Sequence, residues 1–131
     1  MIAVLIFTML LSCSIPKNIP LNIVIEDYKV NDSINYKINK VEIINYSLVL
    51  EIEYLGSKND EFNLLFSGKY KKSYPPIVNL YLDHKQIKSV KSKKLSKILT
   101  YKLDRIEYPN TESTIIYLYY YDDNLIYKHK K

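Results

Sequence analysis

The sequence is poor in several residue types that small proteins use for cross-links and tight turns. It has one cysteine, two glycines and no tryptophan among 131 residues. A lone cysteine cannot form an intramolecular disulfide, so the fold must be stabilised by its hydrophobic core. Arg105 is the only arginine, although the net charge is +5. Because proteins that read phosphates and bases depend on the planar arginine side chain, we expect no nucleic-acid partner.

The single cysteine follows an apolar run at the start of the chain. Residues 2–11 include one polar residue, and Leu10-Leu11-Ser12-Cys13 has the form of a bacterial lipobox. As a helix the run would extend about 15 Å, too short for a hydrocarbon core of about 30 Å. We therefore predict a signal peptide over residues 1–12, cleavage between Ser12 and Cys13, and lipidation of Cys13 by palmitate-type chains. The alternative is an ordinary thiol in an export signal or a buried segment; no Lys or Arg precedes the run.

The residues after the cysteine indicate a tether and then one domain. Residues 13–21 contain Pro16 and Pro20 without a periodic pattern, so we expect a short tether there and a single domain over residues 22–131. About 119 residues remain after cleavage, enough for a core that needs no metal. No acidic cluster follows Cys13, which favours a periplasm-facing outer-membrane lipoprotein over a surface-exposed one.

Alternating apolar residues predict strands throughout the domain. Leu48, Leu50, Ile52 and Tyr54 alternate with more polar neighbours, as in a half-buried strand. The predicted strands cover residues 23–28, 36–44, 48–54, 62–66, 78–82, 99–103, 115–121 and 125–127. Turns are predicted at residues 45–47 and 122–124. Seven or eight short strands predict a single all-β, Ig-like antiparallel β-sandwich, with an open barrel as the alternative.

An ordered series of segments resembles the NigD-like lipoproteins, a group with a C-terminal β-sandwich. The series spans roughly residues 40–121 and comprises Leu48-Val49-Leu50-Glu51-Ile52-Glu53-Tyr54, Glu61-Phe62-Asn63-Leu64, Ser73-Tyr74-Pro75-Pro76, Val78-Asn79-Leu80-Tyr81-Leu82-Asp83-His84 and Leu99-Thr100-Tyr101-Lys102-Leu103. The family often has Gly-Gly-Cys in its first turn and a second cysteine after the histidine. This chain has Gly56-Ser57-Lys58 and no second cysteine. The resemblance implies a location and a fold, and it implies no catalytic residues.

A basic stretch is the strongest candidate binding site. Its members, in a region free of acids from His84 to Leu103, are Lys85, Lys88, Lys91, Lys93, Lys94 and Lys97. They are candidate contacts for an anionic ligand, such as a glycolipid headgroup or an acidic envelope protein. The alternative is a flexible, solvated loop. A second candidate surface is the row Tyr117, Tyr119 and Tyr121, for which core packing is favoured over sugar or protein binding.

Catalytic and metal-binding patterns are weak. Asp83 and His84 are adjacent, and neighbouring side chains of a strand point to opposite faces, so they cannot act together without a bulge. We expect His84 to bond a loop carbonyl at the end of its strand and His129 to lie in a frayed tail, which leaves no pair of imidazoles for zinc. Asn59-Asp60-Glu61 lacks the ligand spacing of a calcium loop and is expected to be a solvated turn.

These observations lead to one expectation and two alternatives. We expect a lipid-anchored binding or interaction module of the cell envelope, with no catalysis, cofactor or metal. One alternative is an immunity-like or peptide-binding protein that acts by strand addition at a sheet edge. The other is an envelope hydrolase that uses Asp83 and His84.

Overall fold

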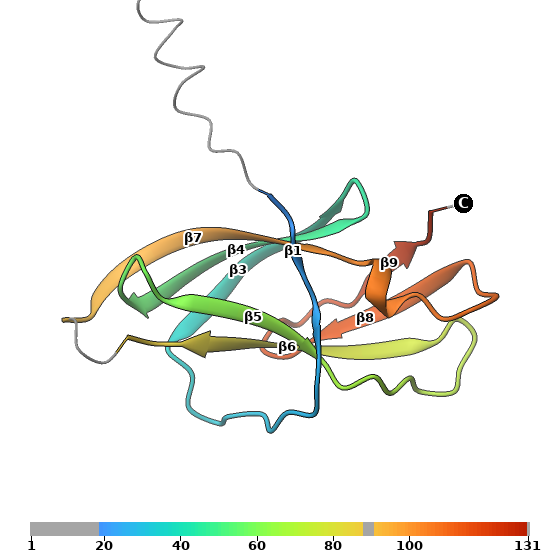
Figure 1. The fold of residues 1–131 in the computed structure, drawn as a ribbon, viewed down its shortest axis with the longest axis horizontal. Coiled ribbons are helices and arrows are strands. Elements are labelled where there is room, and N and C mark those ends of the chain that lie inside the picture. The colour runs from blue at the N-terminus through green and yellow to red at the C-terminus, as the bar shows by residue number, and fades with distance from the viewer. Residues whose placement is uncertain (1–18, 88–90, 131) are drawn as a thin grey trace, which may run out of the picture.

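The computed structural model describes residues 19–87 and 91–130, which form nine strands and one short 3-10 helix (Figure 1). The predictions for Ser12, Cys13 and Lys88 fall outside these residues. The elements are β1 (Leu21–Asn22), β2 (Val24–Ile25), β3 (Tyr36–Ile44), β4 (Ser47–Gly56), β5 (Glu61–Phe66), β6 (Ile77–Lys85), β7 (Lys93–Lys102), η1 (Asp104–Ile106), β8 (Ser113–Leu118) and β9 (Leu125–Lys128). Among the described residues no helix is long and apolar enough to cross a membrane.

The strands form two sheets, which confirms the predicted all-β sandwich. One sheet has the order β1-β7-β4-β3 and the other the order β2-β5-β6-β8-β9. The sheets are mixed, so the prediction of purely antiparallel pairing is wrong: β1 with β7, β2 with β5, and β6 with β8 are parallel. The chain leaves β6, reverses along β7 in the other sheet and reverses again into β8. The strand β8, which lies beside β6, therefore runs in the same direction as β6.

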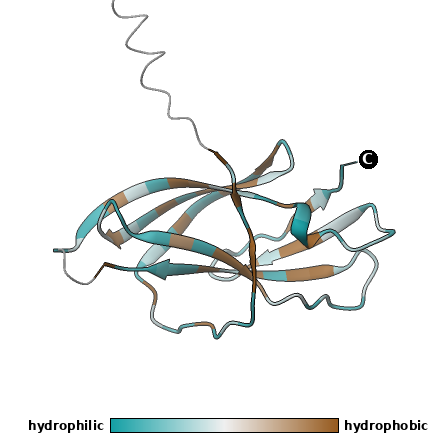
Figure 2. Cartoon of the chain, viewed as in Figure 1, coloured by the Kyte–Doolittle hydropathy of each residue, from teal (hydrophilic) through white to brown (hydrophobic). Residues whose placement is uncertain are grey.

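The alternating residues of the predicted strands form the core between the sheets. Leu48, Leu50 and Ile52 of β4 are at most 1% exposed, as are Leu64 of β5 and Leu82 of β6. Hydrophobic positions recur along the strands of both sheets (Figure 2). Each buried Leu or Ile contributes about 1.5–3 kcal/mol relative to exposure, so these alternating positions stabilise the packing of the two sheets.

Local turn chemistry fixes the first hairpin. Asn45 and Tyr46 have φ values of 48° and 63°, and Ile44 pairs with Ser47. Two consecutive left-handed residues make a type I′ turn, whose twist matches that of the flanking strands. The predicted turn at residues 45–47 is confirmed, as is the turn at residues 122–124 between β8 and the antiparallel β9.

The N-terminal segment crosses from one sheet to the other. In Figure 1 this segment crosses both sheets: β1 pairs with β7 and β2 pairs with β5. The intervening Ile23 is fully buried. The Arg105 guanidinium donates to the carbonyl of Ile23 at 3.0 Å, which anchors the crossing. The predicted strand over residues 23–28 is thus wrong in extent, because the chain changes sheets at Ile23 and leaves the second sheet after Ile25.

Candidate functional site

The outer edge of β7 is open over most of its length. β1 pairs only with Tyr101 and Lys102, and no described segment pairs with residues 93–100 on that side. On the other side, β4 pairs with β7 from Lys93 to Lys102. The sheet therefore ends at a long strand whose backbone groups face outward, a feature that accepts further strands.

The register identifies which backbone groups are unpaired. The N–H of Leu103 donates to the carbonyl of Tyr46 at 3.1 Å, one step beyond the pair of Ser47 with Lys102. Hydrogen-bonded residues alternate along an antiparallel pair, so odd-numbered residues of β7 bond β4 and even-numbered ones face away. Lys94, Ser96 and Ile98 thus present their N–H and C=O groups at the open edge.

A groove runs beside this edge, between β7 and the start of β5. Its volume is about 520 Å³, and its lining includes Leu21, Phe62, Lys97, Ile98 and Leu99. Half of the surface of Ile98 and of Leu21 is exposed. The β2 strand covers only Leu65 and Phe66 of β5, so the edge of β5 next to the groove has no strand partner among the described residues either.

Lys97 lies at the margin of this groove. Its ammonium donates to the backbone carbonyl of Asp60 at 3.4 Å and sits 5.8 Å from the centre of the Phe62 ring. Both contacts hold the charge at the gap between the two sheets. Lys94, on the exposed face of the same strand, lies 4.0 Å from a carboxylate oxygen of Glu53, a weak surface pair.

The basic stretch is only partly a loop. Lys85 ends β6, Lys91 lies in the connection, and Lys93, Lys94 and Lys97 belong to β7. The alternative of a flexible loop is wrong for Lys93, Lys94 and Lys97, because all three pair with β4. Leu95, which lies between them in the strand, is half-buried. Lys91 and Lys93 line a second cavity of about 270 Å³ together with Lys58. No carboxylate lines this cavity.

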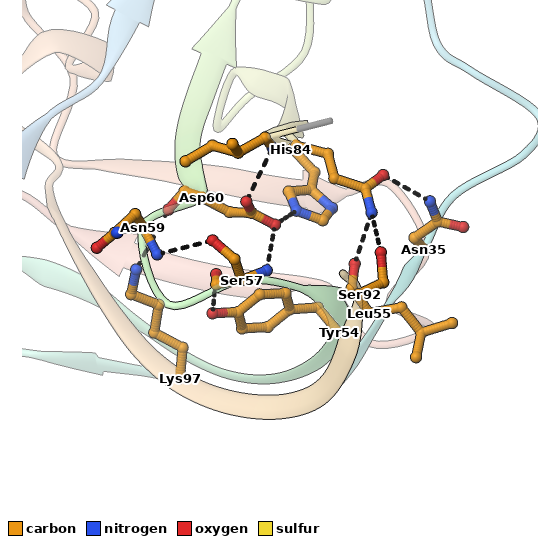
Figure 3. Close-up of polar contacts among 11 residues, drawn as sticks. Asn35, Tyr54, Leu55, Ser57, Asn59, Asp60, His84, Ser92 and Lys97 are labelled. Atoms are coloured by element: carbon orange, nitrogen blue, oxygen red, sulfur yellow. Dashed lines mark hydrogen bonds and ion pairs between the residues drawn. The ribbon is translucent and has the colours of Figure 1, made fainter. Parts of the chain in front are cut away.

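A buried hydrogen bond between a carboxylate and an imidazole holds the end of the sandwich from which β7 starts (Figure 3). The Asp60 side chain is fully buried, and the Nε2–H of His84 donates to its Oδ2 at 2.8 Å. The N–H groups of Ser57 and Ile87 donate to the same carboxylate at 3.0 and 2.9 Å. Asp60 therefore ties the β4–β5 turn to the end of β6 and to the connection that leads into β7.

The hydrogen bonds control the ionisation of Asp60. Burial raises the pKa of its carboxyl, but the donors from Ile87, His84 and Ser57 outweigh burial and lower the pKa from 3.8 to about 2. The ring of His84 stacks on Phe62 with 4.4 Å between centroids. A Cβ on Gly56 would come within 1.9 Å of Asp60 Oδ2, so this close approach requires glycine.

These contacts correct two predictions. The turn predicted at Asn59-Asp60-Glu61 is present and Asn59 and Glu61 are exposed, but Asp60 is only 3% exposed, because three donors compensate the cost of its burial. His84 bonds the carboxylate of Asp60 rather than a loop carbonyl, and Asp83 is not its partner. The pair has the form of an oriented imidazole, yet within residues 19–87 and 91–130 His84 bonds no hydroxyl that would serve as a nucleophile.

His129 is also placed differently from the expectation. Its Nε2 lies 2.6 Å from the hydroxyl of the buried Thr114, and its Nδ1 lies 2.9 Å from the carbonyl of Thr111. The prediction of a frayed tail is wrong, because the N–H of His129 extends the β9 pairing by donating to Glu112. In the part of the chain that the structure describes, no three His, Cys, Asp or Glu residues are grouped to hold a metal ion.

The tyrosine row does not form one continuous face. β8 ends at Leu118, and Tyr120 has a φ of 68°, so strand alternation stops before Tyr119. Tyr117 and Tyr119 keep 39% and 37% of their surface exposed, and core packing was the wrong expectation for both. Tyr119 meets Tyr28 edge to face, since the segment before β3 folds over this sheet.

The fold and the site define a class: a β-sandwich in which the lysine-bearing strand β7 is open along most of its outer edge and lies beside a groove. No protein-family model, curated protein or solved structure matches the chain. The resemblance to NigD-like lipoproteins stays a prediction. The open edge was not predicted from the sequence, because strand order depends on long-range pairing. The available sequence signal for a strand there was the pair of apolar residues Leu95 and Leu99, four positions apart among the lysines.

Proposed function

We propose that this chain is a lipid-anchored, non-catalytic binding module of the bacterial cell envelope that binds an extended polypeptide segment along the edge of β7. The observation that carries the proposal is the outward row of backbone groups at Lys94, Ser96 and Ile98. An added strand pairs such groups one by one, and alternate side chains then supply specificity.

The adjoining groove supports this mode of binding. A strand placed beside β7 directs every second side chain toward Phe62 and Leu99, where about 520 Å³ is open. Backbone hydrogen bonds and apolar burial would thus act together. The buried pair of Asp60 and His84 joins the β4–β5 turn to the end of β6 and to Ile87, so this end of the sandwich is ordered before a partner arrives.

A proline at the edge tests strand addition. Ser96 is exposed, and its N–H faces away from β4, so Ser96→Pro removes a donor from the open edge and no bond from the sheet. Peptides selected from a phage-displayed random library against the wild-type protein should bind Ser96→Ala normally and lose binding to Ser96→Pro. Equal binding to both variants, with unchanged circular dichroism, would contradict the proposal.

The anchor is tested separately by metabolic labelling with palmitate. Cells that express the wild-type chain should incorporate label, and globomycin, which blocks cleavage of lipoprotein signals, should cause the precursor to accumulate. Cys13→Ala should carry no label. Label on Cys13→Ala equal to that on the wild type would remove the lipid anchor from the proposal. Outer-membrane location, facing the periplasm, is then tested by membrane fractionation and by protease treatment of intact cells.

A further inference from the structure

We infer that the segment accepted by β7 is acidic at the end that lies beside Lys93, Lys94 and Lys97 and apolar at the end that lies beside Ile98 and Leu99. This inference rests on the proposed strand addition and specifies its partner. Lys93 and Lys94 begin the open edge, Lys97 lies near its middle, and the apolar Ile98 and Leu99 follow directly. The edge itself is therefore polarised along its length.

Lys97 provides the central contact. Its ammonium uses one donor on the carbonyl of Asp60, which leaves two for an incoming group. Among the described residues Lys97 forms no ion pair. The acidic residues of the groove lining are Glu61 and Asp60, whose carboxylate accepts bonds from His84, Ser57 and Ile87. A carboxylate on the groove side of the added strand would form a charge-assisted hydrogen bond with Lys97.

Other lysines near the open edge add to the preference for an acidic segment. Lys94 is 77% exposed and only loosely paired with Glu53, so it is free to turn toward an added strand. Lys58, Lys91 and Lys93 surround the neighbouring cavity without an acid among its lining residues. A segment that overhangs the start of β7 would thus meet further positive charge.

A second copy of the chain is a poor occupant of this edge. Two β7 strands placed side by side would bring lysines near lysines, and lysine on an edge strand opposes such self-pairing. The same charges attract an acidic strand. The lysines of β7 therefore favour an acidic partner and also oppose aggregation of the protein with itself.

The sequence before β1 is also a poor occupant. Continuing the pairing of Leu21 with Tyr101 toward the N-terminus would put Lys17 opposite Lys97. The like charge of the two lysines opposes this extension and favours another chain at the edge.

Fluorescence anisotropy with paired synthetic peptides tests the inference on the full-length protein in detergent. One peptide has glutamates in one half and valines in the other, and its counterpart has glutamines in place of the glutamates; both are made in the two sequence orders. We expect the better glutamate peptide to bind about tenfold more tightly than its glutamine counterpart. This preference should shrink as salt is raised.

Variants of β7 separate a specific contact from general attraction. Lys97→Gln should remove most of the preference and Lys97→Arg should keep it. Lys102→Gln, which changes the same strand where β1 covers it, should leave it unchanged. Circular dichroism on each variant checks the fold.

Four results would overturn the inference. Equal binding of glutamate and glutamine peptides, or a preference that survives Lys97→Gln, would reject the acidic partner while strand addition stands. Binding to phosphatidylglycerol vesicles but to no glutamate peptide would assign the lysines to a membrane surface. Failure of both peptides and of every library-selected peptide would reject strand addition itself.

Discussion

The carboxylate of Asp60 and the imidazole of His84 lie 2.8 Å apart inside the sandwich, although 24 positions separate them in the sequence. Through this pair, the turn after β4 is joined to the end of β6. The N–H of Ile87 on the same carboxylate extends the link into the connection that precedes β7. A buried charge thus links three segments at this end of the sandwich.

Asp60→Asn should destabilise the protein by about 2 kcal/mol, since hydrogen bonds to a charged group contribute about 1.5–3 kcal/mol. In addition, the NH₂ group of the asparagine side chain would face one of the three donors that bond Asp60, and two donors cannot bond each other. Urea unfolding followed by tyrosine fluorescence measures the change. Glu61→Gln, which removes an exposed carboxylate next in sequence, is the matched control and should stay within about 0.5 kcal/mol. Equal costs for the two variants would show that Asp60 contributes only surface charge.

Acid should remove the contribution of Asp60 over a defined range. The folded-state pKa, about 2, is below the ordinary value of 3.8, so the stabilisation is present above pH 3.8 and is lost as pH falls toward about 2. The difference in unfolding free energy between wild type and Asp60→Asn should therefore narrow over this range. Urea titrations at several pH values test it, and a difference that stays constant down to pH 2 would contradict the assignment.

Gly56→Ala should be destabilising through one identified collision. The added Cβ would meet Asp60 Oδ2 at 1.9 Å, so the cost should fall when Asp60→Ala removes that oxygen. A double-mutant cycle measures this coupling. Gly68→Ala is the comparison, because its φ of 86° imposes a backbone cost of about 1–2 kcal/mol that does not involve Asp60. Additive costs for Gly56→Ala and Asp60→Ala would mean that the turn relaxes around the methyl group.

The sequence predicts the strands better than it predicts the site. The bounds of β3 match the prediction because both ends are set by local signals, the I′ turn at Asn45 and the alternation from Tyr36. Asp60 and His84 could not be paired from the sequence, since their contact depends on the register of β5 with β6. The open edge of β7 likewise depends on long-range pairing, because β1 covers only Tyr101 and Lys102 of that strand.

Tyr101→Phe should cost about 1–3 kcal/mol. The hydroxyl of Tyr101 on β7 donates to the carbonyl of Phe62 on β5 at 2.7 Å, joining the two sheets, and its removal leaves a buried carbonyl without that donor. Burial also raises the pKa of Tyr101, so this contribution should persist below pH 10 and be lost above it. Tyr74→Phe, at a side chain 90% exposed, is the control. Thermal unfolding of both variants checks the prediction, and equal shifts would reject an inter-sheet role for the hydroxyl.

Tyr46→Gly should stabilise the protein, unlike most changes from a large residue to a small one. Tyr46 has a φ of 63°, a conformation that costs a non-glycine residue about 1–2 kcal/mol, and it is 48% exposed. Glycine at the second position of a type I′ turn removes this cost and adds about 0.5–1 kcal/mol of backbone entropy loss on folding. The net gain in unfolding free energy should be a few tenths of a kcal/mol up to about 1 kcal/mol, offset in part by the loss of the Lys130 contact with the ring.

Tyr120→Gly is the comparison. It relieves a similar φ of 68° but removes the edge-to-face contact with Tyr36, and it should therefore destabilise the protein. Urea unfolding of both variants decides the point, and destabilisation by Tyr46→Gly would show that its ring contributes more than its backbone costs.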